Sequence, residues 1–216
     1  MMFDGWPPTA IEFFEGLEAD NSKTYWLAHK DVYERDVKSP MEALLADLTE
    51  EFGEARLFRP YRDIRFSADK SPYKTSIAAT VGSMYVSLSA ERLAAGGGMY
   101  HMAPDQLERY REAVVGAPGR RLQEIVNRLR ATDAEVYGSD ALKSAPRGYP
   151  KDHERVELLR YRGIVAMGSW PAGRWLSTPE AERRVVQTFR SAQPLLEWLN
   201  EHVGPSSEPA NASRHR

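Results

Sequence analysis

Residues 77–88 have the sequence IAATVGSMYVSL, two short apolar runs separated by glycine and serine. Ile77 to Val81 and Met84 to Leu88 favour strands, and the glycine-serine pair between them is typical of a hairpin turn. Leu93 to Tyr100 predicts a third strand of the same meander. Its triplet Gly96-Gly97-Gly98 indicates a bulge or a close approach of another backbone, because glycine is otherwise unfavourable in a strand. The core of the fold is therefore expected to be an antiparallel sheet.

Helical patterns precede this meander. Thr9-Ala10-Ile11-Glu12 is a capping-box pattern, so a short helix is predicted to begin near Thr9. Apolar residues three and four apart predict a second helix over residues 25–37. Ser39-Pro40-Met41-Glu42 is a stronger start signal, and the helix that it opens ends at Gly53. From Phe58 to Phe66 the period changes to two, which predicts another strand.

Helical periodicity returns after the meander, from Pro104 and again from Gly119. Residues 138–153 are rich in turn-forming residues, and Val156 to Met167 is predicted to be helical. A last helix is predicted to begin at Thr178-Pro179. This order predicts the α+β class, with an antiparallel β-meander of about 4–5 strands packed by N-terminal and C-terminal helices.

The composition is that of an ordinary globular protein. The chain has 216 residues, with 29 Lys and Arg, 31 Asp and Glu, and no cysteine. Without cysteine, disulfides, Cys-ligated zinc, iron–sulfur clusters and thiol nucleophiles are excluded. We predict a single α+β domain over residues 1–203, because no stretch is long enough to be a linker. The small, polar residues 204–216 are predicted to form a disordered C-terminal tail.

The N-terminal residues give no targeting signal. Residues 1–10 are polar and contain Pro7-Pro8, with neither a basic n-region nor an apolar h-region. No apolar run approaches the roughly 20 residues that cross a bilayer. We therefore expect a soluble, cytoplasmic protein that has no membrane partner.

The net charge of −2 hides an uneven distribution. Residues 1–54 hold 4 basic and 13 acidic residues, residues 55–162 hold 19 and 13, and residues 163–216 hold 6 and 5. An acidic N-terminal segment thus balances a basic middle. Two interpretations stay open: the acidic helices pair with the basic strands, or the basic middle meets an anionic partner.

The densest positive charge lies in residues 56–74. Six cations share this segment with two carboxylates, Asp63 and Asp69; they are Arg56, Arg59, Arg62, Arg65, Lys70 and Lys74. Arginine offers a planar fork of donors that suits phosphate or carboxylate, and lysine adds a mobile point charge. A loop from Ser67 to Tyr73 could cradle an anion with its hydroxyls and cations.

A second basic segment, residues 142–155, is rich in proline and glycine and carries Lys143 and Arg147. Functional groups are often displayed on such loops. Asp152 beside His153 could orient the imidazole as a general base. Equally, Asp152 could cap a helix that begins just after it.

Several other chemistries lack their sequence signature. His29, His101 and His153 are isolated, with no HExxH or HxH spacing, so no metal site is predicted. The chain has no GxxxxGK[ST], no GxGxxG after a strand and no GxSxG, which argues against a phosphate-binding P-loop, a Rossmann dinucleotide site and a hydrolase nucleophile elbow. No cofactor is expected.

Several segments form a combination that is specific, although each piece alone is common. They are Phe13 to Leu17 with Asn21 and Trp26, His29-Lys30 and Tyr33, Phe58 to Ser67 with Asp69 to Lys74, Ala95 to Tyr100, Leu142-Lys143, Pro146 to Tyr149, and Asp152-His153. Over about residues 9–200 this combination resembles a family of bacterial and fungal proteins, domain of unknown function 2461. Relatives more often carry a doubled Asn where this chain has Asn21 alone, and commonly Pro where Glu154 stands. The resemblance implies a shared fold and a shared patch, and no established activity.

The two basic segments suggest a site for a small anion, a phosphate or carboxylate compound, formed where they meet. Its candidate anion-binding residues are Arg62, Arg65, Lys70, Lys74, Lys143 and Arg147. If the protein is an enzyme, acid–base catalysis would fall to Asp63, Asp69 or His153, and the cations would stabilise developing negative charge. The sequence does not decide whether it is an enzyme.

Two alternatives stay open. The same patch could belong to a non-enzymatic interaction module that binds protein or nucleic acid, with Tyr61, Tyr73 and Tyr149 stacking on bases. The isoelectric point of about 6.2 weighs against nucleic acid without excluding it. Alternatively, the basic residues are purely structural and form buried pairs with the acidic helices. The sequence determines neither the ligand nor the oligomeric state.

Overall fold

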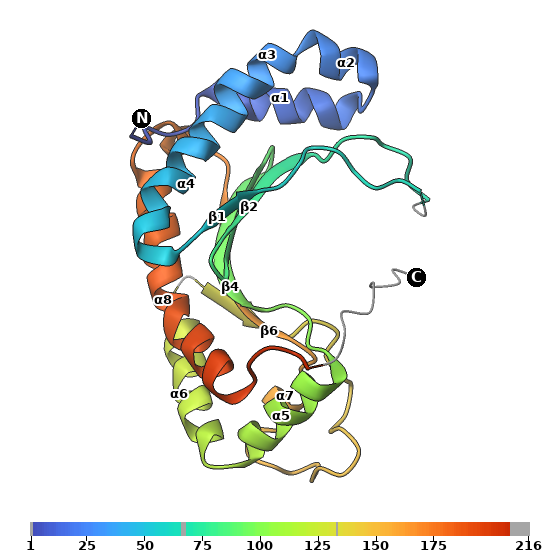
Figure 1. Cartoon of the computed structure of the whole chain (residues 1–216), viewed down its shortest axis with the longest axis vertical. Helices are drawn as coiled ribbons and strands as arrows, with labels where there is room; N and C mark the ends of the chain where they lie inside the picture. Colours follow the sequence, from blue (N-terminus) through green and yellow to red (C-terminus); the bar gives the residue numbers. More distant parts are fainter. Residues whose placement is uncertain (1, 66–67, 133, 208–216) are drawn as a thin grey trace. The chain divides into compact units, whose positions relative to one another are not determined.

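The computed structural model describes residues 2–65, 68–132 and 134–207 (Figure 1). Within these residues six strands form an antiparallel sheet in the order β1-β2-β3-β4-β6-β5. The strands are β1 (Ala55–Leu57), β2 (Ser76–Val81), β3 (Met84–Ser89), β4 (Arg92–Met99), β5 (Ala134–Tyr137) and β6 (Ile164–Pro171). The predicted α+β class is confirmed, with slightly more strands than expected.

The β2–β3 hairpin is the predicted one. Val81 pairs with Met84, so Gly82 and Ser83 form a two-residue turn. Gly82 has a φ of +54°, and a Cβ on it would lie 2.3 Å from the carbonyl oxygen of Phe52, the last residue of α4 (Ser39–Phe52). Glycine is therefore needed at this position both for the turn conformation and for the close approach of the helix end.

The chain forms two compact units. Unit 1 comprises residues 1–95 and 168–189, and unit 2 comprises residues 96–167 and 190–216. The strands β4 and β6 and the helix α8 (Glu180–His202) contribute residues to both units. That the two units make a single domain stays a prediction.

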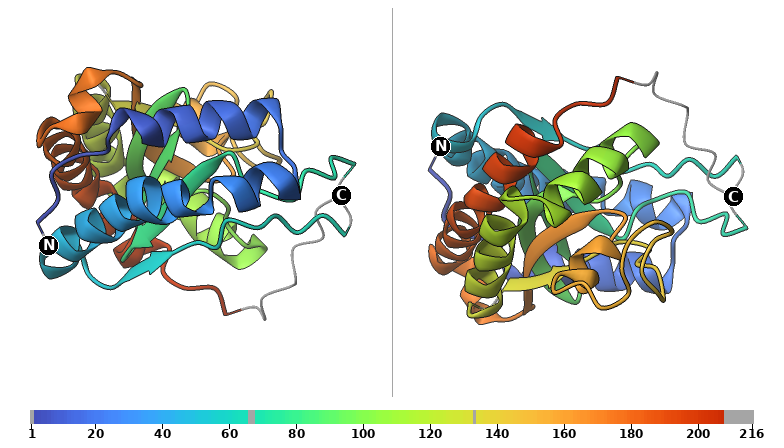
Figure 2. Two further views of the ribbon diagram at one scale, coloured as in Figure 1. Left: turned by 90° about the horizontal axis from the view of Figure 1, so that it is seen from above. Right: turned by 90° about the horizontal axis from the view of Figure 1, so that it is seen from below.

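In unit 1, α1 (Pro8–Ala19) lies beside a row of helical segments (Figures 1 and 2). The row consists of α2 (Lys23–Ala28), α3 (Lys30–Val32), a π-helical turn (Tyr33–Lys38) and α4. It is interrupted at His29, whose φ of −117° is not helical. The helix predicted over residues 25–37 therefore exists, but as short pieces.

Aromatic side chains join the helices of unit 1. The ring of Phe13 lies 5.9 Å from that of Trp26 and 5.5 Å from that of Tyr33, measured between centroids. All three side chains are buried. Phe52 at the end of α4 meets Phe189 of α8 edge to face at 5.2 Å. These contacts bury the apolar faces that the helical periodicity predicts.

Unit 2 contains α5 (Pro104–Val115), α6 (Pro118–Arg130) and the short α7 (Val156–Leu159). The buried residues of α6 recur at three- and four-residue spacing, as predicted. Trp198 of α8 donates its indole N–H to the carbonyl oxygen of Pro118 at 3.1 Å, which ties α8 to the start of α6. Over the described ranges, every helix is too short or too polar to span a lipid bilayer.

Residues 204–207 follow α8 and are held against α5. Arg109 donates to the carbonyl oxygens of Val203 at 2.6 Å and Pro205 at 2.8 Å. Asp105 accepts a hydrogen bond from the backbone N–H of Ser207 at 2.8 Å. The first four residues of the predicted tail are thus bound to α5, and residues 208–216 lie outside the described residues.

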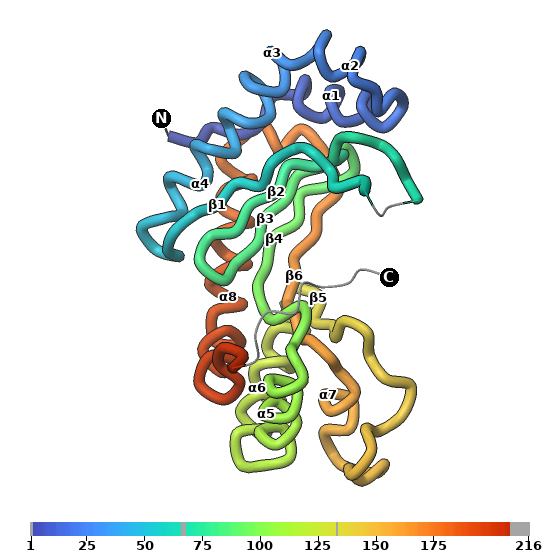
Figure 3. Tube along the Cα trace, turned by 45° about the vertical axis from the view of Figure 1, so that its right-hand side comes forward, coloured from blue at the N-terminus to red at the C-terminus, as the bar shows by residue number. Residues whose placement is uncertain are grey.

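The glycine triplet of β4 allows the predicted close approach. A Cβ on Gly96 would lie 2.1 Å from the carbonyl oxygen of Ala166, and one on Gly98 would lie 2.2 Å from that of Ile164. Gly98 also has a φ of +145°, which favours glycine. The missing side chains let β4 pass directly against β6, its neighbour in the sheet (Figure 3).

The helix predicted over Val156 to Met167 is wrong beyond its first turn. α7 ends at Leu159, and the strand β6 begins at Ile164. Residues 164–166 are all buried, so this run shows neither helical nor strand periodicity. The strand β5 does alternate between buried and exposed residues, but its four residues are too few for a period to be recognised.

Candidate functional site

Residues 58–65 and 68–75 form a two-stranded extension of β1 and β2, which we call the arm (Figure 3). Tyr61 lies opposite Tyr73 in an isolated antiparallel bridge. The backbone N–H of Arg62 donates to the carbonyl oxygen of Pro72 at 2.9 Å, and the backbone N–H of Lys74 donates to the carbonyl oxygen of Pro60 at 2.8 Å. This ribbon carries the first basic segment. Residues 66 and 67, where the predicted anion cradle begins, lie outside the described residues.

The two predicted anion-binding arginines of the arm already have carboxylate partners. Arg65 binds Asp63 in a bidentate manner, with Nε to Oδ1 at 2.9 Å and Nη2 to Oδ2 at 2.7 Å. Arg62 forms an ion pair with Asp69. Both pairs lie within the arm and on its exposed surface.

These contacts also fix the protonation of the two carboxylates. Hydrogen bonds from Arg65 lower the pKa of Asp63 to about 2. Hydrogen bonds from Ser71, and then from Arg62, lower the pKa of Asp69 to about 2. A carboxyl group with such a pKa holds no proton at neutral pH, so Asp63 and Asp69 could act there only as proton acceptors.

The two lysines of the arm, Lys70 and Lys74, make different contacts. Lys70 donates from Nζ to the carbonyl oxygen of Ile64 at 3.1 Å. Lys74 places Nζ 5.5 Å from the centroid of the Phe58 ring. Burial lowers the pKa of Lys74, and the positive charge of Arg59 lowers it further. Within the described part of the chain, no carboxylate pairs with Lys74.

The arm is anchored to the N-terminal helices at Tyr73. Asn21 donates from Nδ2 to the carbonyl oxygen of Tyr73 at 3.1 Å and accepts the backbone N–H of Tyr73 at Oδ1, at 3.0 Å. The Tyr73 ring stacks on that of Trp26, with centroids 4.3 Å apart and planes 6° from parallel. The sequence analysis missed this anchor because its partners are 52 positions apart.

In unit 2, the second basic segment contains a tight turn. The backbone N–H of Tyr149 donates to the carbonyl oxygen of Pro146 at 3.2 Å. Gly148 has a φ of +88°, and no atom would touch a Cβ there. Glycine is thus needed for the turn conformation alone, at the third position of a type II turn. The turn exposes Arg147 and places Tyr149 at its end.

His153 has a structural contact. Its Nδ1 accepts the backbone N–H of Arg155, the residue that precedes α7, at 3.0 Å. Arg155 in turn donates from Nε to the carbonyl oxygen of Val114 at 2.7 Å, near the end of α5. Only Nε2 of His153 is therefore open for the predicted acid–base role.

In unit 2 the charges of Arg162 and Tyr149 act on the guanidinium of Arg111, and we call these three residues the arginine site. Arg111 projects from α5, and Arg162 lies between α7 and β6. The backbone of Arg162 is fixed on both sides: its N–H donates to Ser139 at 3.3 Å, and its carbonyl oxygen accepts from Met102 at 3.2 Å. Three separate segments of unit 2 thus contribute to the arginine site.

Arg111 is in an unfavourable electrostatic environment. Its Nε is shielded from solvent and has no hydrogen-bonding partner among the described residues. Burial lowers the pKa of the Arg111 guanidinium, and the positive charge of Arg162 lowers it further, whereas Tyr149 opposes this effect. Among the described residues, neither Arg111 nor Arg162 forms an ion pair with a carboxylate. Within the described ranges, no carboxylate therefore neutralises either guanidinium group of the arginine site.

The described ranges contain no group of three His, Asp or Glu side chains that could hold a metal ion.

A family model for domain of unknown function 2461, described as a conserved hypothetical protein, matches residues 9–198. The chain belongs to this family. The arm and the arginine site both lie inside the stretch matched to domain of unknown function 2461. No curated protein matches the chain.

In this member of domain of unknown function 2461, Tyr149 of the arginine site lies in the second basic segment that the sequence predicts, and Arg162 follows that segment. Arg111 was not among the predicted residues. A signal was present: Arg111 follows Leu107 by four positions and precedes Val114 by three, so it occupies the apolar stripe of α5. The predicted meeting of Arg62, Arg65, Lys70 and Lys74 with Lys143, Arg147 and His153 would join units 1 and 2, and it stays a prediction.

Proposed function

We propose that this protein binds a small anion, a phosphate or carboxylate compound, at the arginine site. The observation that carries the proposal is the Nε of Arg111, which is withdrawn from solvent and has no hydrogen-bonding partner among the described residues, while the positive charge of Arg162 acts on the same guanidinium. A buried donor without a partner costs free energy, and so do two like charges brought together. An anion between Arg111 and Arg162 would remove both penalties.

The chemistry of the side chains selects the class of ligand. A guanidinium group presents parallel N–H donors that match two oxygens of a phosphate or a carboxylate. Tyr149 adds a hydroxyl group that can donate to the same anion. Lys143 and Arg147 are exposed on the same loop as Tyr149 and strengthen the positive field around the site. A ligand with a second negative group would use this field.

The test is calorimetric titration of the full chain with inorganic phosphate, and separately with citrate, at low ionic strength. We expect saturable binding by the wild type. In Arg111→Gln and in Arg162→Gln we expect affinity to fall at least about tenfold, because a hydrogen bond to a charged group contributes about 1.5–3 kcal/mol. Tyr149→Phe should have a smaller effect, because only one hydroxyl group is lost.

Arg121→Gln is the matched control. Arg121 is an exposed arginine of α6 in the same unit, and it makes no ion pair within the described residues. Its loss should leave the affinity unchanged. The proposal is wrong if neither anion binds the wild type, or if Arg111→Gln binds them as tightly as Arg121→Gln does. Oligonucleotide binding that weakens steeply with salt would instead favour the interaction-module alternative.

A further inference from the structure

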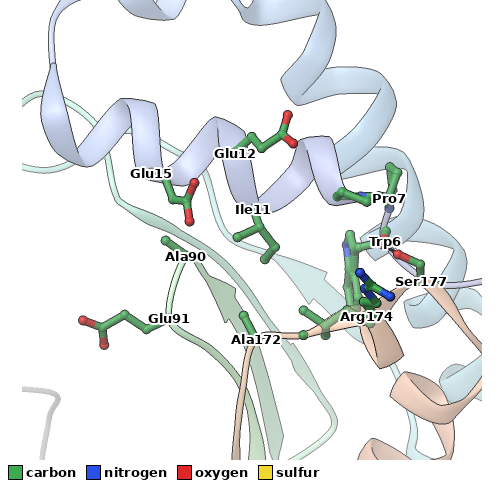
Figure 4. A pocket seen from close by; sticks show the side chains of 13 residues that line it. Trp6, Pro7, Ile11, Glu12, Glu15, Ala90, Glu91, Ala172, Arg174 and Ser177 are labelled. Carbon is green, nitrogen blue, oxygen red and sulfur yellow. Dashed lines mark hydrogen bonds between the residues drawn. The ribbon is translucent and has the colours of Figure 1, made fainter.

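Unit 1 contains a pocket of about 460 Å³ between the start of α1 and residues 172–177 (Figure 4). Its lining is largely apolar and includes Trp6, Ile11 and Ala172. The volume falls within the range of small-molecule sites, about 300–1,000 Å³. The pocket shares no residue with the arginine site.

Hydrogen bonds to backbone carbonyl oxygens hold the walls of this pocket in place. The N–H of Trp6 donates to the carbonyl oxygen of Leu176 at 2.7 Å, and the hydroxyl of Ser177 donates to the carbonyl oxygen of Trp6 at 2.7 Å. The indole N–H of Trp6 donates to Val37 at 3.3 Å. Gly5, with a φ of +97°, lies so close to this segment that a Cβ on it would be 2.5 Å from the oxygen of Leu176. The pocket is therefore largely preformed, which lowers the entropic cost of binding.

Opposite charges stand at the two ends of the apolar floor. In Figure 4, Glu15 of α1 extends towards Ala90 at one end, Arg174 lies beside Trp6 at the other, and Ile11 lies between them. Glu12 and Glu91 also line the pocket, but in Figure 4 their carboxylates point away from Ile11. Within the ranges that the structure describes, Glu15, Glu91 and Arg174 have no side-chain hydrogen bond or ion pair.

We propose that this pocket binds a short apolar zwitterion of the class of a hydrophobic dipeptide. The ammonium group would lie at Glu15, and the carboxylate would lie at Arg174. A neutral apolar ligand would leave both charged ends without a partner, and a simple amine would leave Arg174 without one. An extended dipeptide separates its charged ends by about 7 Å and carries two side chains that can cover Trp6 and Ile11.

The test uses three probes that share the same two side chains and differ in the charge at one end: Leu-Leu, N-acetyl-Leu-Leu and Leu-Leu-amide. We expect the full chain to bind Leu-Leu and to bind each capped dipeptide about fivefold more weakly, the effect of losing one solvent-exposed charge pair. Glu15→Gln should abolish the preference for Leu-Leu over the acetylated dipeptide. Arg174→Gln should abolish the preference for Leu-Leu over the amide.

The two control variants make the same substitutions, Glu to Gln and Arg to Gln, at positions outside the pocket. Glu18→Gln alters an exposed carboxylate of α1, and Arg56→Gln alters an exposed guanidinium of β1, both outside the pocket. Both variants should discriminate among the probes as the wild type does. The proposal is overturned if the wild type does not bind Leu-Leu or binds the three probes equally. It is also overturned if Glu15→Gln and Arg174→Gln weaken all three probes alike.

Discussion

The arm and the arginine site both contain arginine side chains, but the surroundings of these arginines differ in charge. In the arm, Arg65 and Arg62 form ion pairs with Asp63 and Asp69, at the exposed surface. In the arginine site, Arg111 is shielded at Nε and pairs with no carboxylate among the described residues. The arm is the richer in cations along the sequence, but Arg62 and Arg65 are paired there, whereas the two arginines of the arginine site pair with no carboxylate among the described residues.

The difference arises from where the acidic residues fall along each element. A hairpin places Asp63 and Asp69 within reach of Arg65 and Arg62, only two and seven positions away. A helix points successive residues in different directions, so the exposed Glu112 beside Arg111 on α5 cannot share its face. The number of cations in a segment is therefore a poor guide to an anion site. Whether each arginine has a carboxylate partner, and how deeply it is buried, are better guides to such a site.

The largest predicted effect concerns what holds the arm. Trp26→Ala should lower the free energy of unfolding by about 3–5 kcal/mol, because it removes a buried ring that stacks on Tyr73 and packs against Phe13. Urea denaturation followed by circular dichroism measures this. Leu27→Ala is the control, since Leu27 is 61% exposed and its loss should change stability by less than about 0.5 kcal/mol. Similar losses in both variants would show that the stacking does not anchor the arm.

The second prediction separates a binding role of Arg111 from a structural one. Arg111→Met should raise the free energy of unfolding by about 1 kcal/mol in phosphate-free buffer, because it replaces an unpartnered, half-buried charge with an apolar side chain. The same variant should lose the stabilisation that phosphate gives the wild type. Arg121→Met, at an exposed position of α6, should change neither quantity. If Arg111→Met destabilises the protein instead, the guanidinium supports the fold.

The smallest effect is expected in the arm. Arg65→Gln should raise the pKa of Asp63 from about 2 towards its ordinary value of 3.8, because the hydrogen bonds from Arg65 are lost. The free energy of unfolding at neutral pH should fall only slightly, since the pair is exposed to solvent. NMR titration of the Asp63 side chain from pH 5 to pH 1.5 measures the pKa.

The pH dependence has a definite sign. The folded pKa of Asp63 lies below the unfolded value, so its contribution to stability is present above about pH 3.8 and is lost as the pH falls towards 2. Arg65→Gln should remove this dependence, whereas Arg56→Gln should retain it. A wild-type Asp63 that titrates near 3.8 would contradict the ion pair.

The local parts of the fold could be predicted from the sequence. The β2–β3 hairpin is specified by its alternating residues and by Gly82, and the prediction is correct to within a residue. The helix α4 ends at the predicted Gly53, but the helical backbone continues into it from the π-helical turn before Ser39, so the predicted cap at Ser39 does not start it. In each case the residues that determine the structure are neighbours along the chain, so periodicity and turn chemistry are enough.

The parts that failed depend on distant partners. Strand β6 is buried on both faces by elements that the sequence order does not reveal. Its continuous apolar run lacks the alternation of a strand and therefore predicts a helix. Asn21 acquires its role only through Tyr73, 52 positions away. Within the arginine site, Tyr149 lay in a segment already singled out, whereas Arg111 was one charge among many on α5. Its significance comes from burial beside Arg162, which composition does not show.

The side chain of Asn21 has a consequence for how the protein behaves at high concentration. The N–H and carbonyl group of Tyr73 point away from the arm and form an open ribbon edge, which is a template for pairing with another chain. The amide of Asn21 presents the same donor and acceptor as a peptide group, and it satisfies both groups of Tyr73. One side chain thus takes the place of a neighbouring strand at this position and closes it to intermolecular β-pairing.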